Sequence, residues 1–207
     1  MLTKQQVYIL GIFKADIFVR LTFKQIKERS RQKSNNIVQI ALKEFRKQDI
    51  LEVQRVGDIS TYFLNLKNNL TKSYLNLINE LEVQNNKKLP KKILSDIQNR
   101  IFRNTEFFTL LVFGGYAKNK ATEKSDLDIA IIVESEQSKK EVTPFLETIK
   151  RREVINLDYY VFTRSEFLEM LESPEENLGK EIYRKNIIYY GSIQYYNLIA
   201  KEHGPIS

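Results

Sequence analysis

Helical spacing of apolar residues dominates the first 48 positions of the chain. Apolar side chains recur there every three or four residues, which indicates amphipathic helices. Thr3 and Thr22 each stand directly before such a run with Gln three positions later, as in a capping box. The predicted helices cover residues 4–15, 23–29 and 34–48.

Two short runs rich in β-branched and aromatic residues follow these helices. Residues 50–56 and 59–64 flank Gly57 and Asp58, a pattern that predicts a β-hairpin. Three helices and a hairpin in this order resemble a winged helix-turn-helix, with helix 34–48 as the recognition helix and the hairpin as the wing. A small helix-hairpin module used for dimerisation is the alternative. The candidate contacts to double-stranded DNA are Lys33, Asn35, Asn36, Gln39, Lys43 and Arg55.

The pattern then changes to polar helices and, after residue 106, to short apolar runs between helical segments. A break before Pro90 divides residues 68–103 into two predicted helices. We therefore expect a winged domain over 1–67, a helical linker over 68–89 and a second domain over 90–207. Predicted strands cover residues 107–113, 126–133, 154–162 and 187–190, and predicted helices cover 137–151, 165–171, 174–184 and about 191–200. This order predicts an α+β fold, a small mixed sheet with helices packed on one face.

Charge is divided between the two parts of the chain. Residues 1–100 contain 19 Lys and Arg against 9 Asp and Glu, whereas residues 101–207 contain 14 against 17. A basic first half suits a nucleic-acid or acidic partner, although it also serves solubility alone. The absence of cysteine excludes disulfides and thiolate chemistry, and the single histidine, His203, lies in what reads as a solvated tail. No run is long and apolar enough for a membrane span, so we expect a cytoplasmic protein without membrane contact.

Three acidic residues lie at the start of, or within, two successive predicted strands. Asp126 and Asp128 are two positions apart, so they project from the same face of a strand. Asp158 lies within the next predicted strand, on its less apolar face, where a lone charge is costly. If the two strands pair, the three carboxylates meet, and oxygen ligands without His or Cys suit Mg²⁺ or Mn²⁺. The alternative is that each acid only caps a local turn.

A glycine pair, Gly114 and Gly115, ends the strand that precedes these acids. Glycine lets the backbone approach a ligand, and N–H groups at a helix start favour phosphate. Lys118 adds positive charge nearby, and Ser125 stands before the acids, where it either caps the turn or orients Asp126.

Phe113-Gly114-Gly115, then Asp126-Leu127-Asp128-Ile129, then Leu157-Asp158-Tyr159 resemble the nucleotidyltransferase superfamily that includes DNA polymerase β. The stretch from 114 to 128 is most similar to the minimal nucleotidyltransferase (MNT) group, and the resemblance covers roughly residues 90–200. The whole chain thus resembles an MNT domain fused to a winged helix-turn-helix.

The resemblance implies transfer of an NMP, AMP in the first place, from an NTP such as ATP to an acceptor. By that match Asp126, Asp128 and Asp158 bind two Mg²⁺ or Mn²⁺ ions, and Asp158 also helps to activate the acceptor. Gly114 and Gly115 hold the triphosphate, with Lys118 and Ser125 as further nucleotide contacts. The implied acceptor is a protein, for example the HEPN-type toxin of a toxin–antitoxin pair, and a homodimer is a further expectation.

Three departures from the family pattern concern this loop. Gly115 stands where relatives usually have Ser, Lys118 replaces an Arg, and Asn119 replaces a Gly. A phosphate-binding hydroxyl and a guanidinium fork are therefore absent, whereas Asn tolerates the positive φ of a turn. The competing interpretation is a DNA-binding regulator whose second domain only senses nucleotide or dimerises.

Overall fold

The computed structural model describes residues 1–122, 125–152 and 156–202. The chain divides into two compact units, Met1–Ile78 and Asn79–Gly204, and each is described by itself. Predicted residues 123–124, 154–155 and His203 lie outside the described ranges. The division falls within one helix, α4 (Asn69–Asn85), which covers most of the predicted linker.

The three helices predicted for the N-terminal unit are confirmed. They are α1 (Lys4–Leu10), α2 (Phe23–Arg29) and α3 (Asn35–Lys47), and a 3-10 turn, η1 (Gly11–Phe13), continues α1. Thr3 and Thr22 form the expected capping boxes with Gln6 and Gln25. Ser34 is the N-cap residue of α3, but its side chain makes no capping hydrogen bond.

The predicted hairpin is also present in this unit. It consists of β2 (Leu51–Val56) and β3 (Ile59–Leu64), and Gly57 adopts a φ of 59° at the turn. A strand that the sequence pattern did not predict, β1 (Leu21–Thr22), pairs antiparallel with β3, so the sheet order is β1-β3-β2. Two residues are too few for a period-2 pattern to stand out, and only pairing with β3 defines this strand.

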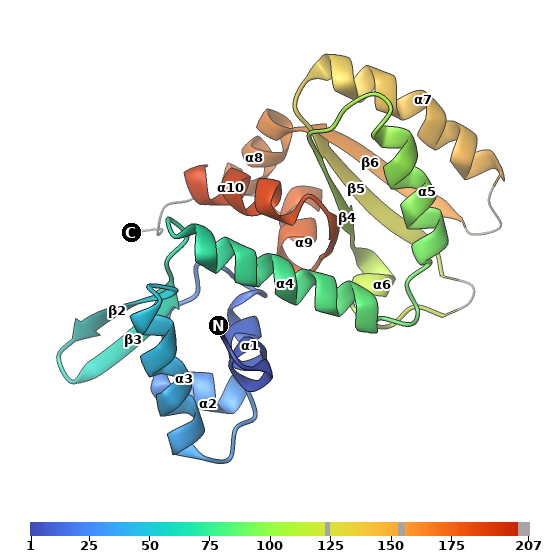
Figure 1. The fold of residues 1–207 in the computed structure, drawn as a ribbon. Coiled ribbons are helices and arrows are strands. Elements are labelled where there is room, and N and C mark those ends of the chain that lie inside the picture. The colour runs from blue at the N-terminus through green and yellow to red at the C-terminus, as the bar shows by residue number, and fades with distance from the viewer. Residues whose placement is uncertain (123–124, 153–155, 203–207) are drawn as a thin grey trace. The chain divides into compact units, whose positions relative to one another are not determined.

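The C-terminal unit contains a four-stranded mixed sheet (Figure 1). Its strands are β4 (Phe108–Val112), β5 (Leu127–Val133), β6 (Leu157–Thr163) and β7 (Ile187–Tyr190). Its helices are α5 (Lys91–Ile101), α6 (Gly114–Ala117), α7 (Glu136–Arg152), α8 (Arg164–Glu172), α9 (Leu178–Arg184) and α10 (Ser192–Glu202). The order is β6-β5-β4-β7, in which β5 and β6 are parallel and the other pairs antiparallel.

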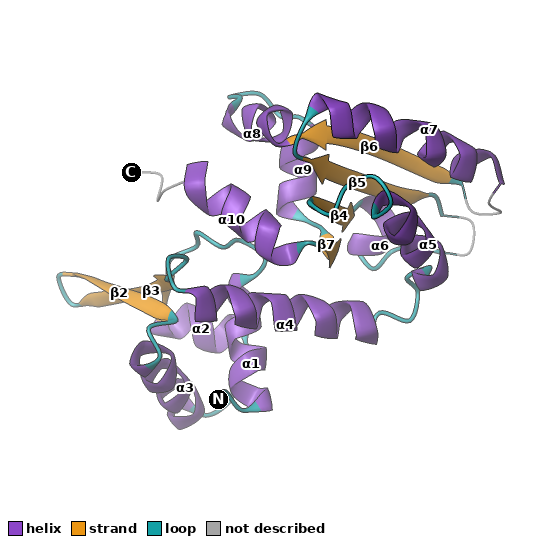
Figure 2. Ribbon diagram, turned by 45° about the horizontal axis from the view of Figure 1, so that its top comes forward, coloured by secondary structure: helices purple, strands orange, loops and turns teal. Residues whose placement is uncertain are grey.

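Helices cover both faces of this sheet, whereas the sequence pattern placed them on one (Figures 1 and 2). On one face, α5 and α7 pack against the side chains of β5 that include Leu127, Ile129 and Ile131. On the other face, the ring of Phe167 in α8 lies 6.2 Å from that of Phe162 in β6. Alternate residues of β5, such as Ile132, are buried there as well. A strand buried on both faces needs helices on both faces, because neither apolar surface tolerates water.

The described helices were also compared with the requirements of a lipid bilayer. None of those in residues 1–122, 125–152 and 156–202 is both long and apolar enough to span one.

Candidate functional site

The two acidic positions at the starts of β5 and β6 are direct neighbours. The strands run parallel, and their register places Asp128 opposite Asp158. Opposed residues of paired strands project from the same face, so the expected meeting of these two acids is confirmed. Asp126 comes immediately before β5, and its Oδ1 accepts a hydrogen bond of 3.0 Å from the amide of Asn156. The three carboxylates thus gather where the two strands begin.

The surroundings of Asp128 shift its pKa. Partial burial raises the pKa of Asp128 above its ordinary value, and a hydrogen bond from the Gly115 N–H lowers it in part. The neighbouring charges of Asp158, Asp126 and Glu181 raise the pKa further. Repulsion among close carboxylates favours a bound cation, because a cation relieves it.

Gly114 is held against Asp128 and has no room for a side chain. Its φ is 60°, and a Cβ atom built on it would lie 2.0 Å from Oδ2 of Asp128. The Phe113 N–H also donates to the Asp128 carbonyl at 3.0 Å, which ties the end of β4 to β5. Position 114 therefore requires glycine both for its backbone conformation and for the close approach of a carboxylate.

Gly115 contacts one of the acids through its backbone. Its N–H donates to the Asp128 carboxylate, and α6, which the pair begins, is only four residues long. A Cβ atom on Gly115 would meet nothing closer than Ala121 Cα at 3.9 Å. The glycine turn thus orients an acid, and its use as a phosphate cradle remains a prediction.

The loop after the glycines is closed by polar contacts. Asn119 adopts a φ of 56°, so its replacement of glycine keeps the turn, as expected. The Ser125 Oγ accepts a hydrogen bond of 2.9 Å from the Thr122 N–H, which matches turn capping, one of the two local roles considered for it, whereas its contact with nucleotide remains a prediction. Lys118 Nζ lies 2.9 Å from Glu181 Oε1 on α9, so its ammonium is paired within the unit.

Three residues near the acids were missed by sequence reasoning. Lys150 of α7 places its Nζ 3.0 Å from Asp158 Oδ1, with both side chains partly exposed. Asn156 bonds Asp126, and Glu181 adds negative charge near Asp128. Asn156 could have been found by its two-residue spacing from Asp158, which places both on one strand face. Lys150 and Glu181 come from helices whose docking no local pattern reveals.

The donor chemistry of the group fits a hard divalent cation in part. Across the described residues, no group of three or more His, Cys, Asp or Glu side chains is arranged to hold a metal ion. Asp158 is engaged by Lys150, so a ready-made two-metal cage is not assembled. Mg²⁺ often binds through one or two carboxylates and completes its shell with water and substrate phosphates. Asp126 and Asp128 provide that carboxylate pair.

The candidate DNA contacts of the N-terminal unit are exposed but not equivalent. Asn35 accepts a hydrogen bond of 2.6 Å from Lys27, and Arg55 folds onto its own hairpin turn, donating to the Gly57 carbonyl at 3.0 Å. Gln39 and Lys43 project from the same side of α3, next to a hollow that β3 also lines. Exposed polar groups on a helix do not establish DNA binding, which stays a prediction.

Comparison with known proteins bears on the C-terminal unit. Residues 95–192 match the family model described as Polymerase beta, Nucleotidyltransferase. The matched segment contains the glycine pair and all three aspartates, and it supports a polymerase β-like nucleotidyltransferase domain there. No curated protein and no solved structure matches the chain.

Proposed function

We propose that the C-terminal unit transfers a nucleoside monophosphate, in the first place AMP from ATP, in a divalent-metal-dependent reaction. The observation that carries the proposal is the register that sets Asp128 beside Asp158, with Gly114 pressed against Asp128. The family match over residues 95–192 supports the reaction class. Lone acids at strand starts serve local capping, but Asp126 and Asp128, which lie close to each other and to Asp158, suit a cation.

Asp126 and Asp128 would hold the metal ion, Mg²⁺ or Mn²⁺. When bound, that ion would neutralise the negative charge of the triphosphate and favour departure of pyrophosphate. The Gly115 N–H and the Asn156 amide keep the two carboxylates oriented. A second ion at Asp158 would have to replace Lys150 as the counter-charge of that carboxylate.

Asp158 is the group proposed to receive the proton of the acceptor hydroxyl. The acceptor oxygen then forms a bond to the α-phosphorus, the bond between that phosphorus and the β-phosphate oxygen breaks, and pyrophosphate leaves. Lys150 Nζ, 3.0 Å from Asp158 Oδ1, would help to hold this carboxylate in place. Lys118 would contact the triphosphate only by exchanging Glu181 for phosphate oxygens.

The acceptor in this proposal is a protein hydroxyl, such as one on a HEPN-type toxin encoded next to this chain. This part rests on the resemblance to minimal nucleotidyltransferases. The chain would then be the antitoxin of the pair, and its N-terminal unit would recruit or regulate.

The proposal is tested by metal binding and by label transfer together. The double substitution Asp126→Asn with Asp128→Asn should abolish Mn²⁺ binding, as measured by electron paramagnetic resonance. The same variant should reduce transfer from α-³²P-ATP to the product of the neighbouring gene by at least about 100-fold. The matched control is Asp96→Asn with Glu106→Gln, two exposed acids outside the group. Label transfer that persists in the first variant, or falls equally in the control, contradicts the assignment.

A second function, a DNA-binding regulator, is favoured by one observation on α3. Asn36, Gln39 and Lys43 are exposed along this helix, and Lys33 precedes it. Binding to duplex DNA should weaken steeply with salt, and Lys33→Ala with Lys43→Ala should weaken it further and reduce the salt dependence. An absence of duplex binding at low salt, measured by fluorescence anisotropy with a random-sequence duplex, would count against this function.

A further inference from the structure

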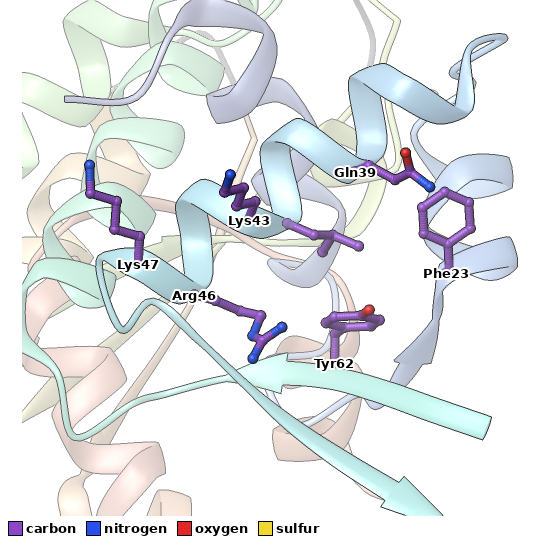
Figure 3. Close-up of a pocket in the computed structure, with 7 residues that line it drawn as sticks. Phe23, Gln39, Lys43, Arg46, Lys47 and Tyr62 are labelled. Carbon is purple, nitrogen blue, oxygen red and sulfur yellow. The ribbon is translucent and has the colours of Figure 1, made fainter. Parts of the chain in front are cut away.

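A basic pocket in the N-terminal unit is not explained by the proposed transfer reaction. It has a volume of about 630 Å³ and is lined by Phe23, Gln39, Leu42, Lys43, Arg46, Lys47 and Tyr62. The lining comes from α2, α3 and β3, so the pocket lies wholly within this unit (Figure 3). Its volume is within the range of roughly 300–1,000 Å³ that is typical of small-molecule sites.

The positive charge of the pocket has no internal counter-charge. Lys43, Arg46 and Lys47 are exposed, and their charged side-chain groups make no hydrogen bond or ion pair with any described residue. No acidic residue is among the described residues that line the pocket. The chemistry of this wall therefore fits an anion.

The spacing of these charges indicates a compact anion. Positions 43, 46 and 47 fall on one side of α3, and they span about 6 Å along the helix axis. A di- or triphosphate group gathers its charge over a similar length.

The other wall of the pocket carries aromatic rings and an amide. Phe23 and Gln39 lie together at one end, and the guanidinium of Arg46 extends toward the ring of Tyr62 (Figure 3). Both rings are half-buried, and Leu42 forms an apolar floor. Aromatic rings stack on nucleobases, and a side-chain amide can pair with the polar edge of a base.

We infer that this pocket binds a free nucleoside di- or triphosphate, with phosphates at Arg46 and Lys47 and the base at Tyr62 and Phe23. Such a ligand combines the two chemistries that the walls offer. The site belongs to the unit without the acidic group, and it needs no metal, because its own cations neutralise the phosphates. A nucleotide bound there would act as an effector, and the pocket would be a second site that senses the substrate.

The test uses the full chain carrying Asp126→Asn and Asp128→Asn, in EDTA, so that metal-dependent binding at the C-terminal unit does not contribute. Binding of fluorescent N-methylanthraniloyl-ATP is measured by anisotropy. Arg46→Ala with Lys47→Ala should weaken it by about tenfold or more. Alanine favours the helix at both exposed positions, so the fold should persist, as circular dichroism will verify.

Matched controls separate a specific pocket from general positive charge. Lys24→Ala with Arg29→Ala removes the same charge from exposed positions of α2 and should change the affinity by less than about twofold. Tyr62→Leu should weaken binding of the nucleotide but not of inorganic triphosphate, whereas Tyr8→Leu on α1 should affect neither.

Three outcomes overturn the inference. The first is no nucleotide binding in EDTA, and the second is an equal loss in the α2 control. The third is duplex DNA that binds through Arg46 and Lys47 while free nucleotide does not, which would assign the pocket to nucleic acid. Because the test chain lacks the acidic pair and metal, its result is independent of whether the proposed transfer reaction occurs.

Discussion

The candidate sites of the two units differ in how their charge is balanced. In the C-terminal unit, Asp126 is bonded by Asn156, and Asp158 is paired with Lys150 at 3.0 Å. In the N-terminal unit, Arg46 and Lys47 face a pocket without a partner among the described residues. This difference in charge balance follows from where the charged side chains lie in the fold. Cations on an exposed helix remain solvated, whereas carboxylates on adjacent strands of a covered sheet repel each other unless a donor or cation is near.

The two sites also differ in how much they must rearrange before a ligand binds. In the N-terminal pocket, the side chains of Arg46 and Lys47 have no described partner to release, so they can accept an anion without rearrangement. In the C-terminal unit, a metal ion at Asp158 would first have to displace Lys150, and Lys118 would have to leave Glu181 before it could contact a phosphate. Substitutions at Gly114, at Lys150 and at Asp128 test this difference, in that order.

The largest effect is expected from Gly114→Ala. The added Cβ would lie 2.0 Å from Asp128 Oδ2 at a φ of 60°, so the backbone or the acid has to move. We expect a loss of about 1–3 kcal/mol of unfolding free energy and of at least about 100-fold in nucleotidyl transfer. Urea denaturation and label transfer measure the two effects.

Gly115→Ala provides the stability control for that substitution. Its Cβ would meet nothing within 3.9 Å, so unfolding free energy should stay unchanged or rise by up to about 1 kcal/mol. Equal destabilisation by the two substitutions would show that Asp128 is not what excludes a side chain at position 114.

An intermediate effect is expected from Lys150→Met, which removes the counter-charge of Asp158. Mn²⁺ affinity should rise about two- to fivefold, because the metal no longer competes with an ammonium for the carboxylate. The unfolding free energy should change by no more than about 1 kcal/mol, since the pair is partly exposed. Lys140→Met, an exposed position of the same helix, should leave metal affinity unchanged in isothermal titration calorimetry. Weaker Mn²⁺ binding in the Lys150 variant would contradict the competition.

The smallest effect concerns Asp128→Asn in EDTA. The raised pKa means that, above the ordinary value of 3.8, the folded chain keeps a proton that the unfolded chain has lost. The free energy of unfolding therefore falls as pH rises through the interval up to the folded pKa, and it stays lower above it. Asparagine does not ionise, so the variant keeps the unfolding free energy that the wild type loses. Its Tm should therefore exceed that of the wild type by about 1–3 °C at pH 7.

The difference in Tm between the variant and the wild type should itself depend on pH. It should shrink as the pH falls through the folded pKa and vanish below 3.8, where Asp128 is protonated in both the folded and the unfolded chain. Differential scanning calorimetry between pH 3 and 8 measures it, with Asp96→Asn as an exposed control. A wild-type chain more stable than the variant at neutral pH would contradict a raised pKa.

Much of the local structure was predictable from residue patterns. The capping boxes at Thr3 and Thr22 are present, and the apolar runs at Phe108–Val112 and Leu127–Val133 are strands. These features depend on residues within a few positions of each other, where the backbone geometry is nearly fixed by propensity and spacing. Strand β1, which exists only through its pairing with β3, was not predictable in this way.

The candidate site was predictable in its acids and not in their partners. The two-residue spacing of Asp126 and Asp128 places both on one face whatever the rest of the chain does. The meeting of Asp128 with Asp158 was conditional on strand pairing, and the parallel register of β5 and β6 supplied it. Lys150 and Glu181 reach the acids from α7 and α9 because of how those helices dock.

The sequence by itself determined the strand face that carries Asp126 and Asp128, because a two-residue spacing places both side chains on one face. Only the tertiary structure decided that the Gly115 N–H serves Asp128, that Lys150 occupies Asp158, and that α2, α3 and β3 enclose a basic pocket. Those contacts join residues of different helices, strands and turns. Their distances depend on strand register and helix docking, which no local pattern encodes.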